Sequence, residues 1–545
     1  MNEKNKENKE NKENKINKTK KNTNKTKKKE YDIIIVGGGI AGLYMMYNVL
    51  LQRPDLKVLL LEKNERLGGR IYTHHETVDG IAYHMDLGAG RIGTHHRLVM
   101  NLIKRLGLER EIVPISDEKS YIEVTNGIPE DKSDLYEETM VKLRQFLKSL
   151  KINLTKHYVF GLCKKYVSKA FAATLGRVFE YKSDIYAFNA ADAATYFTDQ
   201  YAAKSSFFTM KDGIQSIIDA LVQRIGIKKK TGFIIKTSAY VDDIQCDNGD
   251  YTVSYNNGNT GNTGNKAKAK APHLVLALPR NDLSRFTILD SLHGLLDTIN
   301  EIPLLRIYEI YPIEKGKGSW FSHIKKTVTN TRLQMVIPID QKTGLIMSSY
   351  SDYKNAQHWL DLDKGRMKAT LHRLLQEAFA MQIPQSKWLK FHYWPIGVAA
   401  WKRNVDSAAI GGQIVNPLPN LYICGENYSQ YQAWIEGALE TSEKVLSSLS
   451  LIKAKANKGG KTKKKGKGKG KVKISLTEVA RHNKANDAWT VIDGKVYDIT
   501  RWIPQHPGGN IILKALGRDA TSLFNGIGHP DYVKKTILPK YYIAG

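Results

Sequence analysis

A glycine-rich turn near the start of this 545-residue chain constrains its fold more than any other feature. The apolar run 33–36 leads directly into Gly37, Gly39 and Gly42. This spacing is the G-x-G-x-x-G turn that joins the first strand and helix of a dinucleotide-binding βαβ unit. We expect Gly37 to make the tight turn, Gly39 to let a pyrophosphate approach the backbone, and Gly42 to let the helix pack closely. The N–H groups and positive dipole end of that helix would then face the phosphates.

A second strand follows at the separation that such a unit requires. The strand expected at 57–61 ends at Glu62, whose carboxylate can accept a hydrogen bond from a ribose hydroxyl. Strand, glycine turn, helix, second strand and terminal acid occur in order, which makes the motif specific. The alternative interpretation is a glycine-rich turn in another kind of α/β protein.

Four further segments bear on which nucleotide is bound. They are Arg66–Arg70 (R-L-G-G-R), Met85–Ile92, Leu421–Asn427 and Trp434–Leu439. Together they resemble the flavin-containing amine oxidase family, which includes monoamine, polyamine and L-amino-acid oxidases, and the resemblance covers about 31–449. In that family the R-x-G-G-R turn lies along the cofactor pyrophosphate, the late Gly-Glu strand end returns to it, and the segment at Trp434 meets the flavin ring. The resemblance therefore implies FAD.

The same resemblance assigns the cofactor contacts residue by residue. Val241 is placed like the family strand whose backbone reaches the adenine. The residues that we expect to bind FAD are Gly37, Gly39, Ile40, Ala41, Gly42, Glu62, Lys63, Arg70, Gly88, Ala89, Gly90, Arg91, Val241, Gly425, Glu426, Trp434 and Ile435.

The domain organisation follows from these motifs and from composition. We expect an α/β, Rossmann-like FAD-binding domain interleaved with an α+β substrate domain, followed by a small α+β domain. The FAD-binding parts are expected at about 31–98, 208–280 and 396–450, with one strand at 233–241. The substrate parts are expected at about 99–207, within a mostly helical stretch (95–226), and at 281–395, where alternating strands and helices should build most of a sheet. A Lys/Asn/Glu-rich tail (1–30) precedes them, and a Lys/Gly-rich linker (451–473) leads to the small domain at 474–545.

Amine oxidation at a flavin needs a neutral amine held over the ring, so the protein supplies orientation and desolvation. An aromatic-walled cage suits this task. The aromatic residues in segments that resemble the flavin-facing segments of the family are Tyr393, Trp394, Trp401 and Trp434. The alternative for each is an ordinary core position. The segment 391–401 has no cysteine, although monoamine oxidases attach their flavin through one there, so we infer non-covalent FAD.

Two arginines are the residues that we expect to contact the flavin or the substrate. By resemblance, Arg306 stands where the family has a lysine that contacts the flavin through water; a guanidinium stays charged and cannot act as a neutral lysine would. The alternative for Arg306 is a structural ion pair. Arg91 stands where L-amino-acid oxidases hold the substrate carboxylate, and a bidentate arginine–carboxylate pair selects an amino acid. The alternative is that Arg91 neutralises Asp86 or Glu62.

The C-terminal residues 474–545 closely resemble cytochrome b5. A hairpin is expected around Asp493 and Gly494, His506 precedes Pro-Gly-Gly, and His529 follows in Gly-His-Pro. In cytochrome b5 two histidines ligate haem iron from opposite faces, which implies His506 and His529 as axial ligands of haem b. Two imidazoles leave no open position on the iron, so the haem transfers single electrons. The alternative is a steroid-binding relative of this fold, which lacks the paired histidines.

The net charge of +29 is concentrated in two tracts. Residues 1–30 hold 12 Lys against 5 Glu, and residues 453–473 hold 11 Lys and no acid, so the two tracts carry more than half of it. Both lack the apolar residues that offset ordering entropy, and we predict disorder. They are suited to weak, salt-dependent contact with polyanions or anionic surfaces; the alternative is a solvated tail and spacer.

Three cysteines without paired or metal-like spacing fit a reducing compartment. Neither a signal peptide nor a run of 18 apolar residues is evident in the sequence. We therefore expect a cytoplasmic or otherwise intracellular protein without a transmembrane anchor.

The sequence thus predicts an FAD-dependent oxidoreductase acting on the C–N bond of an amine or L-amino acid. We expect hydride transfer to the flavin, hydrolysis of the imine, and hydrogen peroxide as product. Electrons would pass to O2, or to a redox partner protein through the tethered haem, whose local concentration near the flavin is high. One rival is an FAD-dependent desaturase or oxidase acting on a C–C bond. Another is a basic-tailed binding or scaffold protein with an inactive flavin fold.

Overall fold

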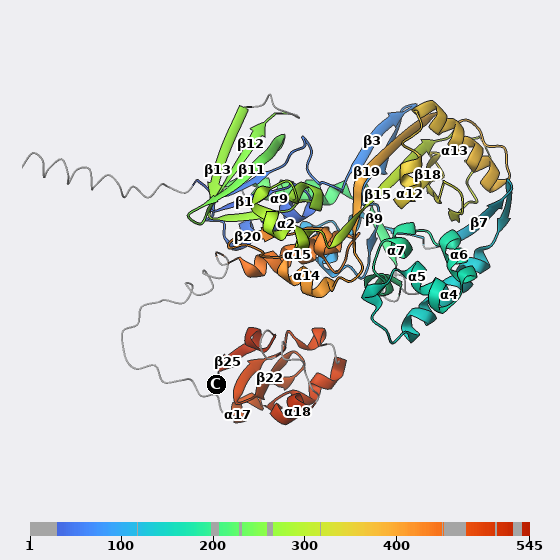
Figure 1. Ribbon diagram of the computed structural model, residues 1–545. Coiled ribbons are helices and arrows are strands. Elements are labelled where there is room, and N and C mark those ends of the chain that lie inside the picture. Colours follow the sequence, from blue (N-terminus) through green and yellow to red (C-terminus); the bar gives the residue numbers. More distant parts are fainter. Residues whose placement is uncertain are drawn as a thin grey trace, which may run out of the picture. The chain divides into compact units, whose positions relative to one another are not determined.

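The structure is a computed structural model in which two compact units, Met1–Lys458 and Gly459–Gly545, are described separately (Figure 1). It describes residues 30–116, 118–197, 206–227, 232–258, 265–314, 316, 318–449, 451, 476–506, 509–526, 533 and 537–544. The expected tail and linker lie almost wholly outside these ranges. None of the helices within the described ranges is both long and apolar enough to cross a membrane.

A five-stranded parallel sheet forms the nucleotide-binding part of unit 1. Its strands, in spatial order, are β10 (Phe233–Lys236), β2 (Val58–Leu61), β1 (Ile33–Val36), β14 (His273–Leu276) and β20 (Leu421–Ile423). The strands are continuously apolar because both faces of the sheet are covered. Ile33 and Ile35 belong to one core cluster, whereas Ile34 and Val36 belong to another.

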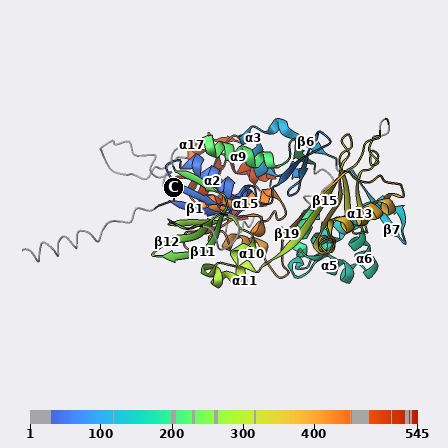
Figure 2. The ribbon, with the colours of Figure 1, turned by 90° about the horizontal axis from the view of Figure 1, so that it is seen from above.

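Helices cover one face of this sheet and a small second sheet covers the other. The helices are α2 (Ile40–Gln52), α3 (Arg97–Leu106), α9 (Gln215–Ile227) and α15 (Ile435–Ser448), which pack together beside β1 (Figures 1 and 2). The second sheet is antiparallel and consists of β11 (Ala239–Asp247), β12 (Asp250–Asn257) and β13 (Asn265–Ala271).

The single strand expected at 233–241 is in fact two strands in different sheets. Ser238 between them has a left-handed backbone, with φ of +50°. The chain turns there, so β10 extends the parallel sheet and β11 begins the antiparallel one. Local apolar pattern alone does not reveal such a turn.

A seven-stranded sheet forms the second half of unit 1. Its strands, in spatial order, are β19 (Trp388–Trp401), β15 (Ile299–Ile310), β18 (Leu345–Asp352), β17 (Met335–Asp340), β16 (Lys326–Thr329), β7 (Lys119–Thr125) and β8 (Ile128–Asp131). Helices α12 (Tyr353–His358) and α13 (Lys364–Phe379) pack on one face. The helices associated with the other core cluster are α4 (Ser133–Ser149), α5 (Val159–Tyr166), α6 (Lys169–Val178), α7 (Lys182–Tyr186) and α8 (Ala190–Thr195).

Residues 99–207, expected to be mostly helical, also contribute strands. β7 pairs in parallel with β16, about 200 residues later in the chain. Further elements of unit 1 include a hairpin of β3 (Thr73–Val78) and β4 (Ile81–Asp86), a sheet of β5 (Ile92–Gly93), β9 (Phe207–Met210) and β6 (Ile112–Ile115), and the short helices α10 (Arg280–Leu283), α11 (His293–Leu296) and α14 (Ser407–Gln413).

Unit 2 is a small α+β fold. Its strands are β21 (Asn483–Lys484), β22 (Asp487–Ile492), β23 (Lys495–Asp498), β24 (Arg518–Asp519) and β25 (Tyr542–Ala544), and its α-helices in the described ranges are α17 (Leu476–Val479) and α18 (Thr521–Gly526). The turn between β22 and β23 holds Asp493 and Gly494, both with positive φ (+51° and +72°). Two positive φ angles are the requirement of a type I′ hairpin turn, so the hairpin expected there is present.

Candidate active site

The glycine turn between β1 and α2 is shaped by close backbone contacts. Gly37 has φ of +108°, and a Cβ atom on it would lie 2.4 Å from the carbonyl oxygen of Ala277. A Cβ on Gly42 would lie 2.0 Å from the carbonyl oxygen of Gly37. At Gly39, by contrast, the nearest atom to such a Cβ would be the Gly69 Cα at 3.8 Å. The turn is therefore crowded where it folds on itself and open at Gly39, where a phosphate would approach.

The Arg66–Arg70 turn lies directly against this loop. Gly68 N donates to Gly38 O at 2.9 Å, and Gly39 forms a bridge with Gly68. At the end of β2, the buried carboxylate of Glu62 accepts hydrogen bonds from Gly38 N at 2.7 Å and from Asn64 N at 2.9 Å. Three segments thus converge on one edge of the parallel sheet.

A cavity of about 1190 Å³ begins at this edge and extends to the seven-stranded sheet. The predicted cofactor residues that line it are Gly37, Gly39, Ile40, Ala41, Glu62, Lys63, Arg70, Gly88, Ala89, Gly90, Arg91, Val241, Gly425, Glu426, Trp434 and Ile435. Gly42 is not among the lining residues, because it lies behind the turn against Gly37. The structure therefore brings together residues that lie far apart in the chain, from Gly37 to Ile435.

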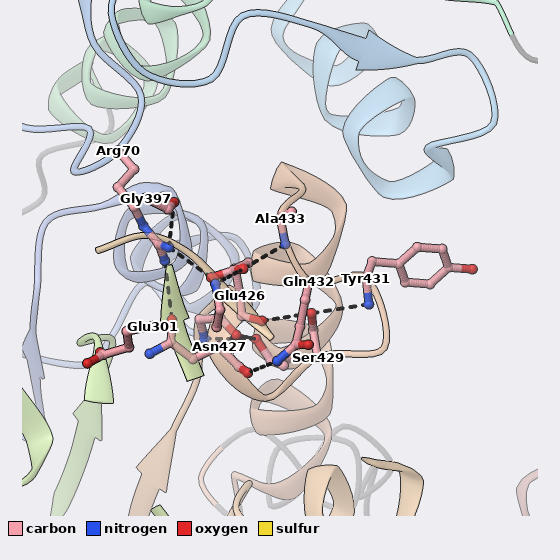
Figure 3. A network of polar contacts seen from close by, with 12 residues as sticks. Arg70, Glu301, Gly397, Glu426, Asn427, Ser429, Tyr431, Gln432 and Ala433 are labelled. Atoms are coloured by element: carbon pink, nitrogen blue, oxygen red, sulfur yellow. Dashed lines mark hydrogen bonds and ion pairs between the residues drawn. The ribbon is translucent and has the colours of Figure 1, made fainter. Parts of the chain in front are cut away.

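Glu426 holds several of these segments in place (Figure 3). Its carboxylate accepts hydrogen bonds from Arg70 Nη1 at 2.9 Å, Ala399 N at 2.9 Å and Ala433 N at 2.6 Å. Arg70 Nη1 also donates to Gly397 O at 3.1 Å. Next to it, Gly425 has φ of +131° and would have no atom within 4 Å of a Cβ. A backbone that only glycine adopts easily, facing open space, suits the close approach of a cofactor.

Trp434 forms part of an aromatic wall around Arg91. Its ring stacks on Phe207 with 5.8 Å between centroids and an interplanar angle of 11°. The Cζ atom of Arg91 lies 4.7 Å from the Phe207 ring centre, 5.3 Å from that of Trp434 and 5.4 Å from that of Tyr181. All four residues line the cavity. Guanidinium groups gain cation–π energy in such positions, and more of it when water is excluded.

The carboxylates considered as alternative partners of Arg91 both accept hydrogen bonds from other groups. Asp86 accepts from Thr73 Oγ1 at 2.6 Å and from Ile214 N at 3.1 Å, and Glu62 accepts the bonds described above. The pKa of Asp86 is raised, chiefly by burial. These contacts give both acids a structural role of their own.

The three aromatic residues expected on β19 take different positions. Trp394 lines the cavity, and its Nε1 donates to Leu87 O at 2.8 Å. Tyr393 packs with the helix-covered cluster on the opposite face of the sheet, as its neighbouring position on the strand requires. Trp401 is 1% exposed in the core beneath the parallel sheet, and its Nε1 donates to Ser429 O at 3.0 Å. The structure thus places Trp394 and Trp434 at the cavity, whereas Trp401 is a core residue and the partly buried Tyr393 packs on the other face of the sheet.

Arg306 lines the cavity as expected but is tightly held. Its Nη1 donates to Asp86 O at 2.5 Å, and its guanidinium lies 4.5 Å from the ring centre of Tyr350. A Cβ on Gly90 would lie 2.7 Å from Arg306 Nη1. The absence of a side chain at Gly90 therefore makes room for this guanidinium, which a backbone carbonyl and an aromatic ring anchor.

His96 is a buried neighbour of the aromatic wall. Its side chain is fully buried, its Nδ1 accepts from Gly93 N at 3.1 Å, and its ring lies edge-on to Trp434 at 4.7 Å. Burial, His95 and Arg91 lower the pKa of His96 to about 3. The ring is therefore neutral near pH 7, which keeps a second positive charge away from Arg91.

Several cavity residues carry no sequence signal that marks them. They come from α4, β7, β9, β16, α7 and the segment before α7, and include Lys119, Tyr136, Glu180, Tyr181, Asp184, Phe207 and Lys326. Burial, Asp352 and Glu180 raise the pKa of Asp184 well above its ordinary value. A buried carboxyl with a raised pKa on a cavity wall is a common feature of functional sites.

In unit 2, the described residues include one of the two expected haem ligands. His506 Nδ1 lies 3.2 Å from Gly509 O, a contact that orients the ring as second-shell bonds orient metal-binding histidines. Ile511 and Leu513, shortly after it, are 42% and 40% exposed, and a porphyrin could cover such apolar side chains. His529 lies outside the described residues.

Comparison with known proteins finds a matching family model for each of the two units. Residues 40–445 match the family of flavin containing amine oxidoreductases, and residues 475–545 match the cytochrome b5-like heme/steroid binding domain. The C-terminal region is 47% identical over 71 residues to cytochrome b5 of Borago officinalis, which is 13% of this chain and 53% of that protein. The chain thus spans about half the length of that relative, and 15% of a fatty acid desaturase from Dictyostelium discoideum that it also matches.

Solved structures show the same fold as unit 1. Cyclohexylamine oxidase from Brevibacterium oxydans IH-35A superposes with a TM-score of 0.60 at 17% identity, covering 78% of this chain and all of that one (100%). A protein assigned as a protoporphyrinogen oxidase, from Exiguobacterium sp. 255-15, gives 0.58 at 16% identity, covering 77% and 99%. At these identities the likeness concerns the fold.

The two domains account for two cofactors, FAD and haem. The glycine turn, the open backbone at Gly39 and Gly425, and the cavity that connects them fit a dinucleotide. In unit 2, the contact between His506 and Gly509 fits a haem ligand.

Proposed function

The chain belongs to the family of flavin containing amine oxidoreductases and carries a cytochrome b5-like domain, and we propose that it oxidises the C–N bond of an amine that bears a carboxylate, above all an L-amino acid. The observation that carries this proposal is the position of Arg91. Its guanidinium lies on the cavity wall among Tyr181, Phe207 and Trp434. Guanidinium is the natural receptor for a carboxylate because two N–H groups match the two oxygens.

The chain's own residues supply binding and orientation. Arg91 would hold the carboxylate, while Trp434 and Phe207 would exclude water from the carbon that bears the nitrogen. Trp394, fixed by its bond to Leu87 O, would limit movement on the other side. FAD, when bound, would accept two electrons and the hydrogen of the C–H bond next to the nitrogen. We infer that it is held without a covalent bond, because the segment 391–401 contains no cysteine. The imine then hydrolyses in water to a keto acid and ammonia.

A panel of substrates added without oxygen tests the proposal. We expect L-amino acids to bleach the oxidised flavin band, and the matching amines that lack the carboxylate to do so at least about 100-fold more slowly, the loss of a charged bidentate contact. Arg91→Met should remove this preference. Arg373→Met, an exposed arginine paired with Glu377 on α13, is the control and should keep it. Equal rates with amines and amino acids would contradict the assignment of Arg91.

Electrons must then leave the flavin domain. We propose that they pass to O2, yielding hydrogen peroxide, or singly through the haem domain to a partner protein. Haem that stays oxidised while substrate reduces the flavin anaerobically would contradict the second route. Peroxide release in air would support the first.

Oxidation of a C–C bond is the second candidate. Apolar side chains that line the cavity favour it, among them Val113, Ile115, Ile337 and Ile339. Arg91, which also lines the cavity, favours the amino acid, because a carboxylate is not required for C–C oxidation. If no amine or amino acid bleaches the flavin, the C–C reaction becomes the leading candidate.

A further inference from the structure

A chain of polar contacts lies at the edge of the parallel sheet where the glycine turn begins. Lys63, directly after Glu62 at the end of β2, has its Nζ 3.0 Å from Asp282 Oδ2 on α10. Arg285, shortly after α10, has its Nε 3.4 Å from the other oxygen of Asp282. Its Nη1 donates to Tyr240 Oη, at the start of β11, at 2.6 Å. Lys63, Asp282, Arg285 and Tyr240 thus form a continuous polar bridge.

The order of the strands shows what this polar bridge spans. β2 and β14 pair with opposite sides of β1, the strand that leads into the glycine turn, and α10 follows β14. The pair of Lys63 and Asp282 therefore joins the chain on one side of β1 to the chain on its other side. Tyr240 follows β10, the outer neighbour of β2. In sheets of this kind, nucleotides bind outside the carboxyl ends of the strands, which is where the polar bridge lies.

All four residues of the polar bridge line the cavity. They adjoin residues that we expect to bind the adenosine half of FAD, because Lys63 follows Glu62 and Tyr240 precedes Val241. The polar bridge also faces solvent, since the side chains of Lys63 and Arg285 are 46% and 35% exposed. Side chains that face both cavity and solvent form the wall between them. The polar bridge is therefore part of the wall that encloses the adenosine end of the cavity.

Asp282 is the joint of the polar bridge. Each of its two carboxylate oxygens holds one of the two cations, and its side chain is 17% exposed. The Cζ atom of Arg285 also lies 4.9 Å from the ring centre of Tyr240 and 5.1 Å from that of Phe286, so aromatic contacts orient the guanidinium. Without Asp282, Lys63 and Arg285 would lose the anion that joins them and would repel each other.

We propose that the polar bridge retains FAD, and that Asp282 acts as a positioning residue that holds Lys63 and Arg285 across the adenosine. Since we infer FAD without a covalent bond, its release depends on non-covalent contacts alone. A dinucleotide with its pyrophosphate at Gly39 would have its adenosine inside the polar bridge, and the ion pairs must open before it leaves. This inference concerns the cofactor and does not depend on which substrate is oxidised.

The rate of FAD release from the full FAD-loaded chain tests the proposal without turnover. Free FAD is measured by its fluorescence in ultrafiltrates taken at successive times after dilution. We expect Asp282→Asn to release FAD at least about fivefold faster than the unaltered chain, the effect of losing two partly exposed ion pairs. Asp290→Asn, which loses an exposed pair with His293, is the control and should release FAD at the unaltered rate. Equal release rates in Asp282→Asn and the unaltered chain would overturn the proposal.

The salt dependence of release distinguishes the polar bridge from a general loss of stability. Raising KCl from about 0.05 M to about 0.5 M screens exposed ion pairs. It should therefore accelerate release from the unaltered chain more than from Asp282→Asn. An equal response to salt in the two proteins would refute the role of the ion pairs.

Two further variants test whether Lys63 and Asp282 act together. Lys63→Met should speed release, and the double variant with Asp282→Asn should release FAD no faster than Asp282→Asn alone, because both changes break one bridge. Asp282→Glu keeps the carboxylate and should release FAD at close to the unaltered rate. Additive effects in the double variant, or release from Asp282→Glu as fast as from Asp282→Asn, would contradict the proposal.

Discussion

Arg70 and Glu426 are 356 residues apart in the chain, yet Arg70 Nη1 donates to Glu426 Oε2 at 2.9 Å (Figure 3). The bond joins the R-x-G-G-R turn to the end of β20, two segments that the sequence relates to the same cofactor. The other Glu426 oxygen fixes the backbone at Ala433, next to Trp434. One buried carboxylate thus connects the expected pyrophosphate region with the aromatic wall.

We predict that Glu426→Ala destabilises unit 1 by about 3–5 kcal/mol, because it leaves Arg70 and two backbone N–H groups without their acceptor. Glu426→Gln retains one acceptor oxygen and should cost about 1–3 kcal/mol. Urea unfolding measures the loss of stability in each variant. The amount of flavin retained after gel filtration should be lower in Glu426→Ala than in Glu426→Gln. Lys444→Ala, which breaks an i,i+4 pair with Glu440, should change stability by less than about 1 kcal/mol. A smaller loss in Glu426→Ala than in this control would show that the network is dispensable.

Two glycine substitutions should have opposite effects. In Gly42→Ala the new Cβ would lie 2.0 Å from Gly37 O, so α2 must move away from the turn. We expect a loss of about 1–3 kcal/mol and reduced FAD binding. Gly161→Ala adds a Cβ in helix α5 with no atom within 4 Å, and should stabilise by about 0.5–1 kcal/mol. Thermal unfolding with and without added FAD compares them; equal FAD affinity in both variants would argue against the close-packing role of Gly42.

The buried neutral ring of His96 should make stability depend on pH. Its pKa is about 3 in the folded chain and 6.5 ordinarily, so the unfolded state binds a proton first as the pH falls. The contribution of the neutral ring to the free energy of unfolding is complete above pH 6.5. It is lost as the pH falls from 6.5 to 3, at up to about 1.4 kcal/mol per pH unit. His96→Asn should therefore flatten the dependence of urea unfolding free energy on pH in this window. His293→Asn, a largely exposed histidine, is the control; if its curve and that of His96→Asn coincide, the assignment is wrong.

The sequence was informative where one local motif encodes the structure. The glycine turn and the acid at Glu62 could be assigned because their backbone requirements are local. The different positions of Tyr393, Trp394 and Trp401 on β19 could not be assigned from the sequence. A register shift between Ile302 and Leu304 on its partner β15 leaves Trp394 opposite Leu304, which also lines the cavity. Trp401 lies in another core cluster, and neither outcome follows from the order of aromatic residues.

The residues at the far end of the cavity could be predicted even less from local sequence patterns. Lys119 and Lys326 become neighbours only because β7 pairs with β16 across about 200 residues of chain. Glu180 reaches them from the segment before α7. A lysine at the start of an alternating strand is most often solvated, so the sequence favours a surface role for each. Tertiary pairing, which local patterns do not encode, creates the cluster.

The haem domain allows a last prediction that separates ligand binding from electron transfer. His506→Ala and His529→Ala should each abolish the b-type haem spectrum, because each removes an expected axial ligand. His482→Ala should retain it, since His482 stacks on Trp489 and bonds to Asp487 at 2.7 Å. If substrate electrons pass from flavin to haem, anaerobic addition of substrate reduces both in the unaltered chain but only the flavin in His506→Ala. Haem that remains oxidised in the unaltered chain would assign the two domains to separate electron routes.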